Sequence, residues 1–385
     1  AMMKASGVAD GLVFLGGMLH LTGHAFTVFV LLASSLMAAA TGSSIGTLLA
    51  AMPIFFPAGV ALGADPAMLA GAMLSDAIFG DNLAPVSDVT VISSVTQRFR
   101  DGTPADIAGV VRTRLPYAMT ALAVSMPVYA FMGASRPVSE AALSGDASAL
   151  LMLVPVAVLI AVAVRTRDVL MAISAGTVTG TATGLLIGRL SFATIFAADD
   201  GRLSGFLISG ISNVSPIILL CVTLFAFTGI VREAGVPDMM AKALEAGSAG
   251  RPSALRTELF LSAATLVVTT LFAAVTSASV ALVGSLTDDI GRASNVHPYR
   301  RSHILSGLAN SLPVLMPFSA FVLITMAAVS GLEGAAAVTP FTLMTAAFYP
   351  IALFLVFGFM VLTGTGRMME TPEPEAAEAK TATAL

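Results

Sequence analysis

Long apolar runs, separated by short polar clusters, follow one another along most of this 385-residue chain. Runs of this length are typical of helices that cross a lipid bilayer. Two apolar segments, 67–96 and 304–330, carry polar interruptions near their centres. The pattern therefore predicts an all-α, polytopic membrane protein with interrupted helices. Its other predicted helices are a short amphipathic one at 12–21 and apolar ones at 24–40, 48–62, 115–131, 149–164, 169–188, 215–231, 258–274, 280–290 and 340–362.

The first interrupted segment holds the densest polar chemistry, in the sequence FGDNLAPVSD at 79–88. A carboxylate at bilayer depth costs about 2.5–3.5 kcal/mol even on lenient insertion scales, so Asp81 and Asp88 indicate a site for Na⁺ or a proton. Pro85 removes a backbone donor and frees carbonyl groups at the same depth, which a cation can use. Capping of the following half-helix is the alternative role of both carboxylates. The predicted ion site consists of Asp76, Asp81, Asn82, Ser87, Asp88 and Thr90.

Landmarks of this segment recur later in the chain. Pro66, Pro85 and Ser87 have the same mutual spacing as Pro298, Pro317 and Ser319, and the clusters 7–10 and 40–44 resemble 235–238 and 275–279. Internal repeats with interrupted apolar segments in corresponding positions are typical of secondary transporters, whose binding site lies between the repeats. We predict one repeat at about 1–133 and a second at about 205–363, joined by helices at about 149–188.

Hydroxyl and amide groups at corresponding breaks are candidates for substrate binding, with small-residue packing as the alternative. They are Thr41, Ser43, Ser44 and Thr47 in the first repeat and Asn310, Ser311 and Ser319 in the second. Glycines at every fourth position from Gly176 to Gly188 give a flat helix face. Such a face packs either within the bundle or in a homodimer.

Composition and charge restrict the class of protein further. Hydrophobic residues make up 56% of the chain and charged residues 11%, against about 25% charged in soluble domains. The chain therefore forms a single transmembrane domain over 1–363, and 364–385 is expected to be a disordered acidic tail. A net charge of −4 without a basic run indicates no nucleic-acid partner, and the lone Cys221 excludes a disulfide framework.

Charged residues and the start of the chain give three further expectations. Asp288 and Asp289 are expected at a helix end near water. An apolar helix precedes Gly235 whereas only six residues precede Gly7, so we expect that an N-terminal membrane helix is missing from the first repeat. Polar loops are predicted around three arginine groups. The groups are Arg98, Arg100, Arg112 and Arg114; Arg165 and Arg167; and Arg292, Arg300 and Arg301.

The segment FGDNLAPVSDVT, with ATGSSIGT upstream of it, resembles the NhaC-type Na⁺/H⁺ antiporter family, whose members read FGDK-x-SP-x-SDTT after TGTS-x-GT. The resemblance implies the fold of the ion-transporter superfamily, with two inverted repeats, re-entrant hairpins and broken helices. Asn82 departs from the family pattern, which has a lysine there. The positions that match the family pattern are Thr41, Gly42, Ser44, Gly46, Thr47, Asp81, Pro85, Ser87, Asp88 and Thr90.

These observations together predict a secondary active transporter and no enzyme. A Na⁺/H⁺ antiporter fits best, working by alternating access while Na⁺ and H⁺ compete for Asp81 and Asp88. Na⁺- or H⁺-coupled transport of a small organic acid or amino acid is the alternative. An intramembrane aspartyl protease is disfavoured because Ile78 stands where its motif needs glycine. No cofactor is expected besides the transported ions, and the expected location is the inner membrane of a prokaryotic cell.

Overall fold

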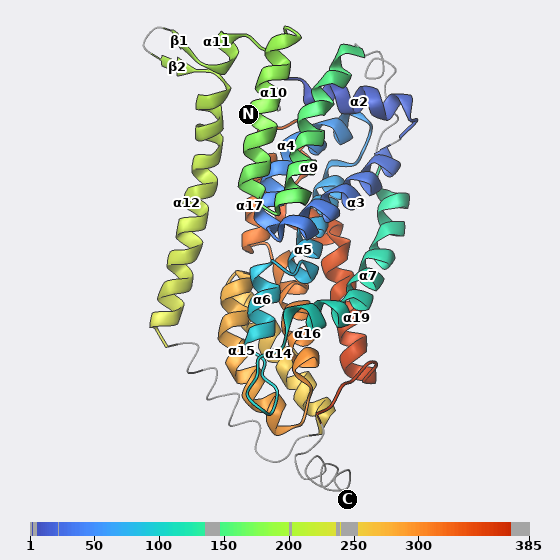
Figure 1. Cartoon of the computed structure of the whole chain (residues 1–385), viewed down its shortest axis with the longest axis vertical. Helices are drawn as coiled ribbons and strands as arrows, with labels where there is room; N and C mark the ends of the chain where they lie inside the picture. Colours follow the sequence, from blue (N-terminus) through green and yellow to red (C-terminus); the bar gives the residue numbers. More distant parts are fainter. Residues whose placement is uncertain are drawn as a thin grey trace, which may run out of the picture.

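The computed structural model describes residues 2, 6–21, 23–134, 147–199, 202–235, 239 and 253–370, which lie mostly in helices (Figure 1). Six of the described helices are long and apolar enough to cross a membrane, or up to eight spans if each of two bent pairs counts as one. The prediction of an α-helical, multi-pass membrane protein is therefore confirmed. A short antiparallel pair of strands, β1 (Ala197–Asp199) and β2 (Arg202–Ser204), is the exception within the described residues.

The elements fall into three successive parts. The first contains α2 (Val8–Met18), α3 (Gly23–Thr41), α4 (Ser44–Ala61), α5 (Pro66–Leu83), α6 (Asp88–Val95) and α7 (Ile107–Met132). The second contains the 3₁₀ helix η1 (Ala147–Leu153), α9 (Val154–Thr166), α10 (Val169–Leu186), α11 (Phe192–Ile195) and the two strands. The third contains α12 (Phe206–Glu233), α14 (Ala254–Leu271), α15 (Thr276–Ala293), α16 (Pro298–Ala309), η2 (Leu312–Leu315), α17 (Ala320–Val329), η3 (Ala335–Ala337), α18 (Pro340–Ala346) and α19 (Phe348–Thr363).

The landmarks that predicted a repeat occupy the same structural places in the first and third parts. Pro66 and Pro298 begin α5 and α16, where proline costs no hydrogen bond, and Ser87 and Ser319 precede α6 and α17. Gly7 and Gly235 both have a positive φ, 73° and 69°; the rest of the second landmark, 236–238, lies outside the described residues.

The two helix pairs that end at corresponding breaks lie in opposite halves of the molecule. In Figure 1, α3 and α4 lie in the upper half, α14 and α15 lie in the lower half, and both pairs turn near the middle. This arrangement is the one expected of inverted repeats, and the inversion itself stays a prediction.

Helix α5 lies at the centre of the bundle. Every residue from Met68 to Leu83 is buried, and α3, α4, α7, α18 and α19 all pack against the helix. Two glycines allow this close packing. A Cβ atom at Gly71 would lie 2.3 Å from the Ala346 carbonyl oxygen, and one at Gly80 would lie 2.5 Å from the Ala38 Cβ.

The glycine face of α10 packs within the chain. Cβ atoms at Gly176, Gly180 and Gly184 would meet Leu159, Met2 and Leu190, so this face is occupied inside the bundle. A homodimer stays a prediction without support from this face.

Helix α16 is buried except at Tyr299, which corrects the predicted loop around Arg300 and Arg301. The Arg300 Nε donates to Glu258 at 2.9 Å and the Arg301 guanidinium donates to Asp288 at 2.7 Å. Asp288 was expected near water and is only 6% exposed. The hydropathy pattern placed Arg300, Arg301 and Asp288 in loops or near water. It could not show that each charge is buried together with an oppositely charged partner.

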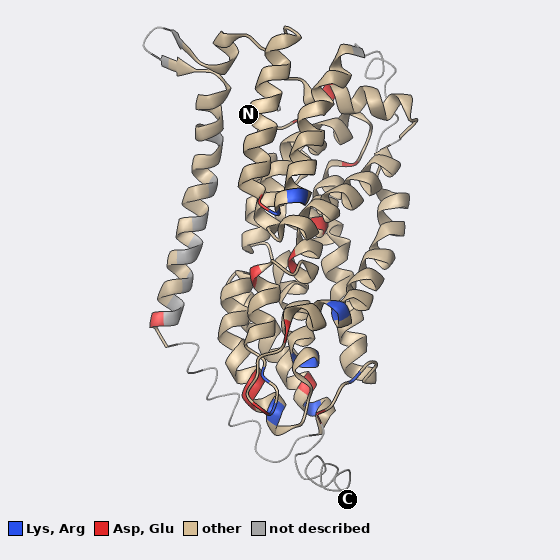
Figure 2. Cartoon of the chain, viewed as in Figure 1, with Lys and Arg blue, Asp and Glu red and all other residues tan. Residues whose placement is uncertain are grey.

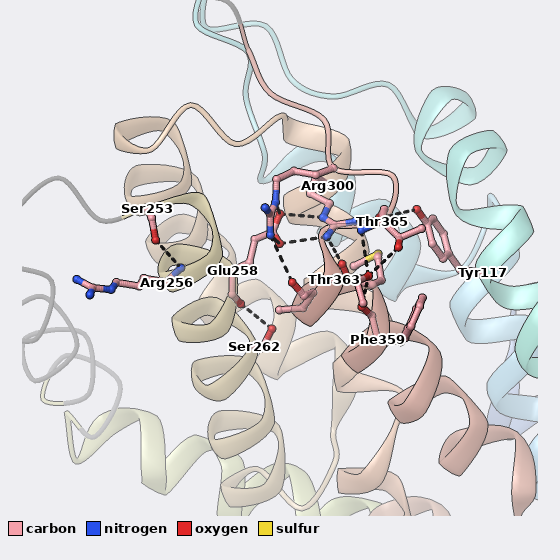
Figure 3. Close-up of polar contacts among 12 residues, drawn as sticks. Tyr117, Ser253, Arg256, Glu258, Ser262, Arg300, Phe359, Thr363 and Thr365 are labelled. Atoms are coloured by element: carbon pink, nitrogen blue, oxygen red, sulfur yellow. Dashed lines mark hydrogen bonds and ion pairs between the residues drawn. The ribbon is translucent and has the colours of Figure 1, made fainter.

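Residues 364–370 also differ from the prediction, which placed them in a disordered tail. Arg367 donates to Glu258 at 2.9 Å, and the Thr365 carbonyl accepts from Arg300 at 2.8 Å (Figure 3). The Glu370 N–H donates to the Asn295 carbonyl. The hydrogen bond with Glu258 raises the pKa of the Arg367 guanidinium. This segment, which we call the C-terminal strap, packs on the lower end of the molecule; 371–385 lie outside the described residues.

Candidate functional site

The helix breaks surround a cavity of about 480 Å³. Its walls come from the α3–α4 and α5–α6 breaks of the predicted first repeat and from the α14–α15 break and the start of α17 in the predicted second repeat. Figure 2 places acidic residues near the mid-height of the molecule, above the charges gathered at the lower end. The polar side chains that line the cavity are Ser43, Ser44, Asp81, Asp88, Thr276 and Ser277.

Asp81, in the last turn of α5, is the buried acid of the cavity and is 2% exposed. Its Oδ1 accepts a hydrogen bond from Ser87 at 3.0 Å. Its Oδ2 lies 3.5 Å from the Thr276 hydroxyl of the second repeat. The Asp81 carboxylate is therefore held between the two repeats by hydroxyl groups, and no ion pair to it is found among the described residues.

Asp88, the first residue of α6, is the exposed acid of the cavity. Its Oδ1 accepts from the N–H of the next residue, Val89, at 2.9 Å. Its Oδ2 accepts from the Ser277 hydroxyl of the second repeat. The cap position of α6 is Ser87, which makes no side-chain capping bond, so Asp88 does not occupy the predicted cap position and lines the cavity.

Four helix N-termini converge on the cavity, those of α4, α6, α15 and α17. Each carries a partial positive charge and unpaired N–H groups, which favour negative groups nearby. Val275, which precedes α15, gives that helix no side-chain cap. The helix ends therefore give the cavity a partial positive character that suits negatively charged groups.

Close packing at the tip of the first hairpin brings α3 onto the α5–α6 break. Gly42 has φ 65°, and a Cβ atom there would lie 2.8 Å from the backbone nitrogen of Ser87. Glycine tolerates both this φ and this approach. The matching ATGSSIGT motif therefore has a steric role here besides any role in binding.

Two of the carbonyls at the end of α5, which the sequence assigned to a cation, have hydrogen-bond partners in this structure. The Asp81 carbonyl accepts from the Thr90 hydroxyl at 3.1 Å, and the Asn82 carbonyl accepts from Arg114 at 2.8 Å. Thr90 and Asn82 therefore hold the break together and are not among the residues that line the cavity. The Asn82 amide donates to the Tyr349 hydroxyl at 3.3 Å.

Some of the predicted substrate-binding residues line the cavity and the others do not. Ser43 and Ser44 line the cavity, and Ser43 also caps α4 by accepting from Gly46. The other candidates do not line it and are buried in the described structure. Thr41, Thr47, Asn310, Ser311 and Ser319 form this second group.

Sequence reasoning missed Arg114, which was assigned to a loop and is fully buried in α7. Its guanidinium donates to the Asn82 carbonyl, to the hydroxyls of Ser306 and Ser302 at 2.9 Å each, and to Ser93 at 3.2 Å. It joins the α5–α6 break of the first repeat to α16 of the second. The sequence carried little signal, because Arg114 lies just before the predicted apolar helix at 115–131 and close to the exposed Arg112.

Thr276 and Ser277 were also missed as site residues, although the repeat comparison had matched their cluster to 40–44. Thr276 contacts Asp81, which lies 195 positions away in the sequence, and Ser277 contacts Asp88, which lies 189 positions away. Only the fold brings them to the cavity.

Asp76 lies apart from the cavity, one turn and a half earlier on α5. It is 1% exposed, and neither of its carboxyl oxygens has a hydrogen-bond partner. No group of three or more His, Cys, Asp or Glu side chains suited to a metal ion exists among the described residues. Any cation at the cavity would therefore rely on two carboxylates and neutral oxygens.

Comparisons with known proteins agree with the predicted resemblance over the first third of the chain. A malate-2H⁺/Na⁺-lactate antiporter of Bacillus subtilis is 32% identical over 129 residues, which are 34% of this chain and 26% of that protein. The Na⁺/H⁺ antiporter NhaC of Alkalihalophilus pseudofirmus is 39% identical over 93 residues, 23% of this chain and 19% of NhaC. The matches thus span about a quarter of these relatives' own lengths or less.

A solved structure, that of Neisseria gonorrhoeae MtrF from a class of antimetabolite efflux pumps, gives a TM-score of 0.39 at 12% identity, covering 94% of this chain and 81% of MtrF. The sequence profile of the Na⁺/H⁺ antiporter family matches residues 3–134, which contain both predicted motifs and both acids of the cavity. Residues 3–134 of this membrane protein are therefore similar to the Na⁺/H⁺ antiporter family, a family of transporters, and the match covers about a third of the chain.

Proposed function

We propose that this protein is a Na⁺/H⁺ antiporter of a prokaryotic inner membrane that works by alternating access. The observation that carries the proposal is the pair Asp81 and Asp88, which lines one cavity between two repeats and contacts hydroxyls of both. The family match over residues 3–134 supports it, because both acids lie in the matched segment.

Competition for the two carboxylates couples the ions. Na⁺ binds between Asp81 and Asp88, and the hydroxyl groups of Ser44, Thr276 and Ser277 turn their oxygen atoms to the ion. A proton on either carboxyl removes the charge that attracts Na⁺ and frees an O–H donor for a neighbouring hydroxyl. Each ion therefore weakens the binding of the other, as exchange requires.

Occupancy of the cavity also changes the contact between the repeats. The acids of the first repeat are held by Thr276 and Ser277 at the start of α15 in the second. Leaving both carboxylates charged and without a cation is costly at this depth. The repeats therefore rearrange only when Na⁺ or H⁺ is bound, which prevents movement of the empty carrier.

One observation favours a second candidate, the coupled transport of a small organic anion. A cavity of about 480 Å³ is larger than one cation needs and lies in the range of small-molecule sites. The four helix N-termini suit a carboxylate of the substrate. The B. subtilis relative is described as an exchanger of malate and lactate.

Reconstituted vesicles distinguish the two candidates. The protein is placed in liposomes with a pH dye inside, Na⁺, Li⁺ or K⁺ is added outside, and ²²Na⁺ uptake is followed in parallel. The antiporter releases protons from the vesicle when Na⁺ alone is added. A transporter of organic anions needs malate or lactate as well.

The acids are tested in the same assay. Asp81→Asn and Asp88→Asn are expected to slow Na⁺-driven proton movement by about tenfold or more, since each removes a charge that binds the ion. Asp65→Asn is the matched control, because Asp65 caps α5 outside the cavity and asparagine caps equally well. Unchanged exchange in both cavity variants would reject the site, and no proton movement with any cation or anion would reject the function.

A further inference from the structure

Asp76 is a carboxyl group that the mechanism above does not use. It lies on α5 five residues before Asp81, is 1% exposed and is not among the residues lining the cavity. Neither of its oxygens accepts a hydrogen bond. A buried ion without a partner is far more costly than a neutral carboxyl, so this environment suits a carboxyl that carries a proton.

The hydroxyl of Ser34 on α3 interacts with the Asp76 carboxyl. The two groups do not meet the geometric criteria of a hydrogen bond, and the Ser34 hydroxyl has no other hydrogen-bond partner among the described residues. The packing of the two helices fixes this pairing. One turn further along both helices, Gly80 lies against Ala38 so closely that a Cβ atom would come within 2.5 Å of the alanine methyl. Asp76 and Ser34 are therefore opposed by the same close contact that holds α5 against α3.

Within the described part of the chain, no cation or second acid faces Asp76 from the surrounding helices. Helices α4, α17 and α18 contain no titratable residue, α3 contains only His24 in its first turn, and α6 contributes Asp88, which faces the cavity. The arginines of α7 lie more than three turns from its Tyr129. The titratable groups nearest to Asp76 are therefore tyrosines.

Both tyrosine hydroxyls are already engaged. Tyr129 of α7 donates to the Ala346 carbonyl at 2.8 Å and shares a hydrogen bond with Ser75. Tyr349 of α19 accepts from Asn82. Neither hydroxyl donates a hydrogen bond to the Asp76 carboxyl in this structure.

We propose that Asp76, with Ser34, forms a proton-binding site separate from the cavity, which takes a proton and no metal ion. A metal ion would need several oxygen ligands, and the site offers one carboxyl group and one hydroxyl. The proposal rests on the proposed antiport function. It adds that protons are carried at two places while Na⁺ binds at one.

The second site has a consequence that can be measured. If Asp76 releases its proton once per cycle in addition to the exchange at Asp81 and Asp88, more than one proton moves for each Na⁺. The exchange then carries net charge and responds to a membrane potential. Asp76→Asn removes the extra proton but keeps the size and neutrality of the side chain.

The test measures the potential at which Na⁺-driven proton movement reverses in vesicles clamped with K⁺ and valinomycin. We expect the wild-type protein to move more than one H⁺ per Na⁺ and to respond to the potential. Asp76→Asn lowers this ratio to about one and abolishes the response, while the Asp65→Asn control behaves as wild type. An Asp76→Asn protein with the wild-type ratio and response overturns the proposal.

A second measurement does not depend on transport. Infrared spectroscopy of the purified protein detects the C=O stretch of a protonated carboxyl, and we expect a band that Asp76→Asn removes, that Ser34→Ala shifts, and that disappears as pH rises. A band that pH leaves unchanged, or that Asp76→Asn retains, overturns the proton site. If wild-type vesicles show no Na⁺-driven proton movement, the proposed function fails, and the infrared result still decides the state of Asp76.

Discussion

At the scale of single residues, the buried arginines fall into two kinds. Arg300 is paired with the carboxylate of Glu258, as a buried charge normally is. Arg114 is also fully buried, yet its described partners are carbonyls and hydroxyls, and no carboxylate pairs with it. Charged side chains in such positions are seldom retained without a role. Arg114 holds the α5–α6 break against α16, so it positions the segment that carries Asp81.

Arg114→Lys tests this positioning role. A lysine keeps the charge but loses the planar fork that reaches several acceptors at once, so we expect a loss of about 1–3 kcal/mol in stability and slower exchange. Arg112→Lys is the control, because Arg112 is an exposed arginine on the same helix. Thermal unfolding in detergent and ²²Na⁺ uptake are the measurements. Equal effects of the two substitutions would contradict the role of Arg114.

At the scale of helices, apolar periodicity predicted the lipid-facing elements well. The predicted helices at 24–40 and 169–188 correspond to α3 and α10. The polar central helices were predicted poorly, since α16 begins at Pro298 rather than at 304. Hydropathy reports the cost of exposing a residue to lipid, and it cannot register that Arg300 and Arg301 meet partners on other helices.

The candidate site, like the helices, was predicted only where the local sequence carries the signal. The acids Asp81 and Asp88 were found because their cost in an apolar segment is visible in the local sequence. Thr276 and Ser277 were not identified from the sequence, because only the tertiary fold places them beside the acids. The carbonyls of the break were assigned to an ion, whereas Thr90 and Arg114 occupy them.

Helix α5 depends on its closest contact with α3. Gly80→Ala adds a Cβ atom 2.5 Å from the Ala38 Cβ and 2.6 Å from its carbonyl carbon, so the helices must separate. We expect a loss of about 1–3 kcal/mol in stability, as for overpacked cores, together with impaired exchange.

Gly358→Ala is the matched control for this substitution. Gly358 is also within a helix, α19, and a Cβ atom there meets nothing within 4 Å. Alanine should stabilise that helix by about 0.5–1 kcal/mol. Thermal unfolding of both variants measures the difference; a Gly80→Ala protein as stable as wild type would show that α3 and α5 are not tightly packed.

At the scale of the whole molecule, charge is concentrated at the end opposite the α3–α4 pair (Figure 2). There, Glu258 on α14 forms ion pairs with Arg300 of α16 and with Arg367 of the C-terminal strap (Figure 3). Arg301 and Asp288 form a second pair between α16 and α15. The strap therefore binds to the hairpin of the second repeat, whose tip supplies Thr276 and Ser277 to the cavity.

The ion pairs that Glu258 forms with Arg300 and Arg367 should contribute differently to the stability of the protein. Glu258→Gln leaves Arg300, which has no exposure, without a counter-charge, and breaking a buried pair in this way costs about 3–5 kcal/mol. Arg367→Gln leaves the buried pair intact and removes a side chain that is 26% exposed, so we expect a cost below about 1 kcal/mol. Unfolding of the two purified variants, compared with the double variant, measures both values.

Because Arg367 contacts the same carboxylate, the loss of stability caused by Arg367→Gln should largely vanish in the Glu258→Gln background. Equal losses from the two single substitutions would mean that the strap, and not the buried pair, holds this end of the second repeat together.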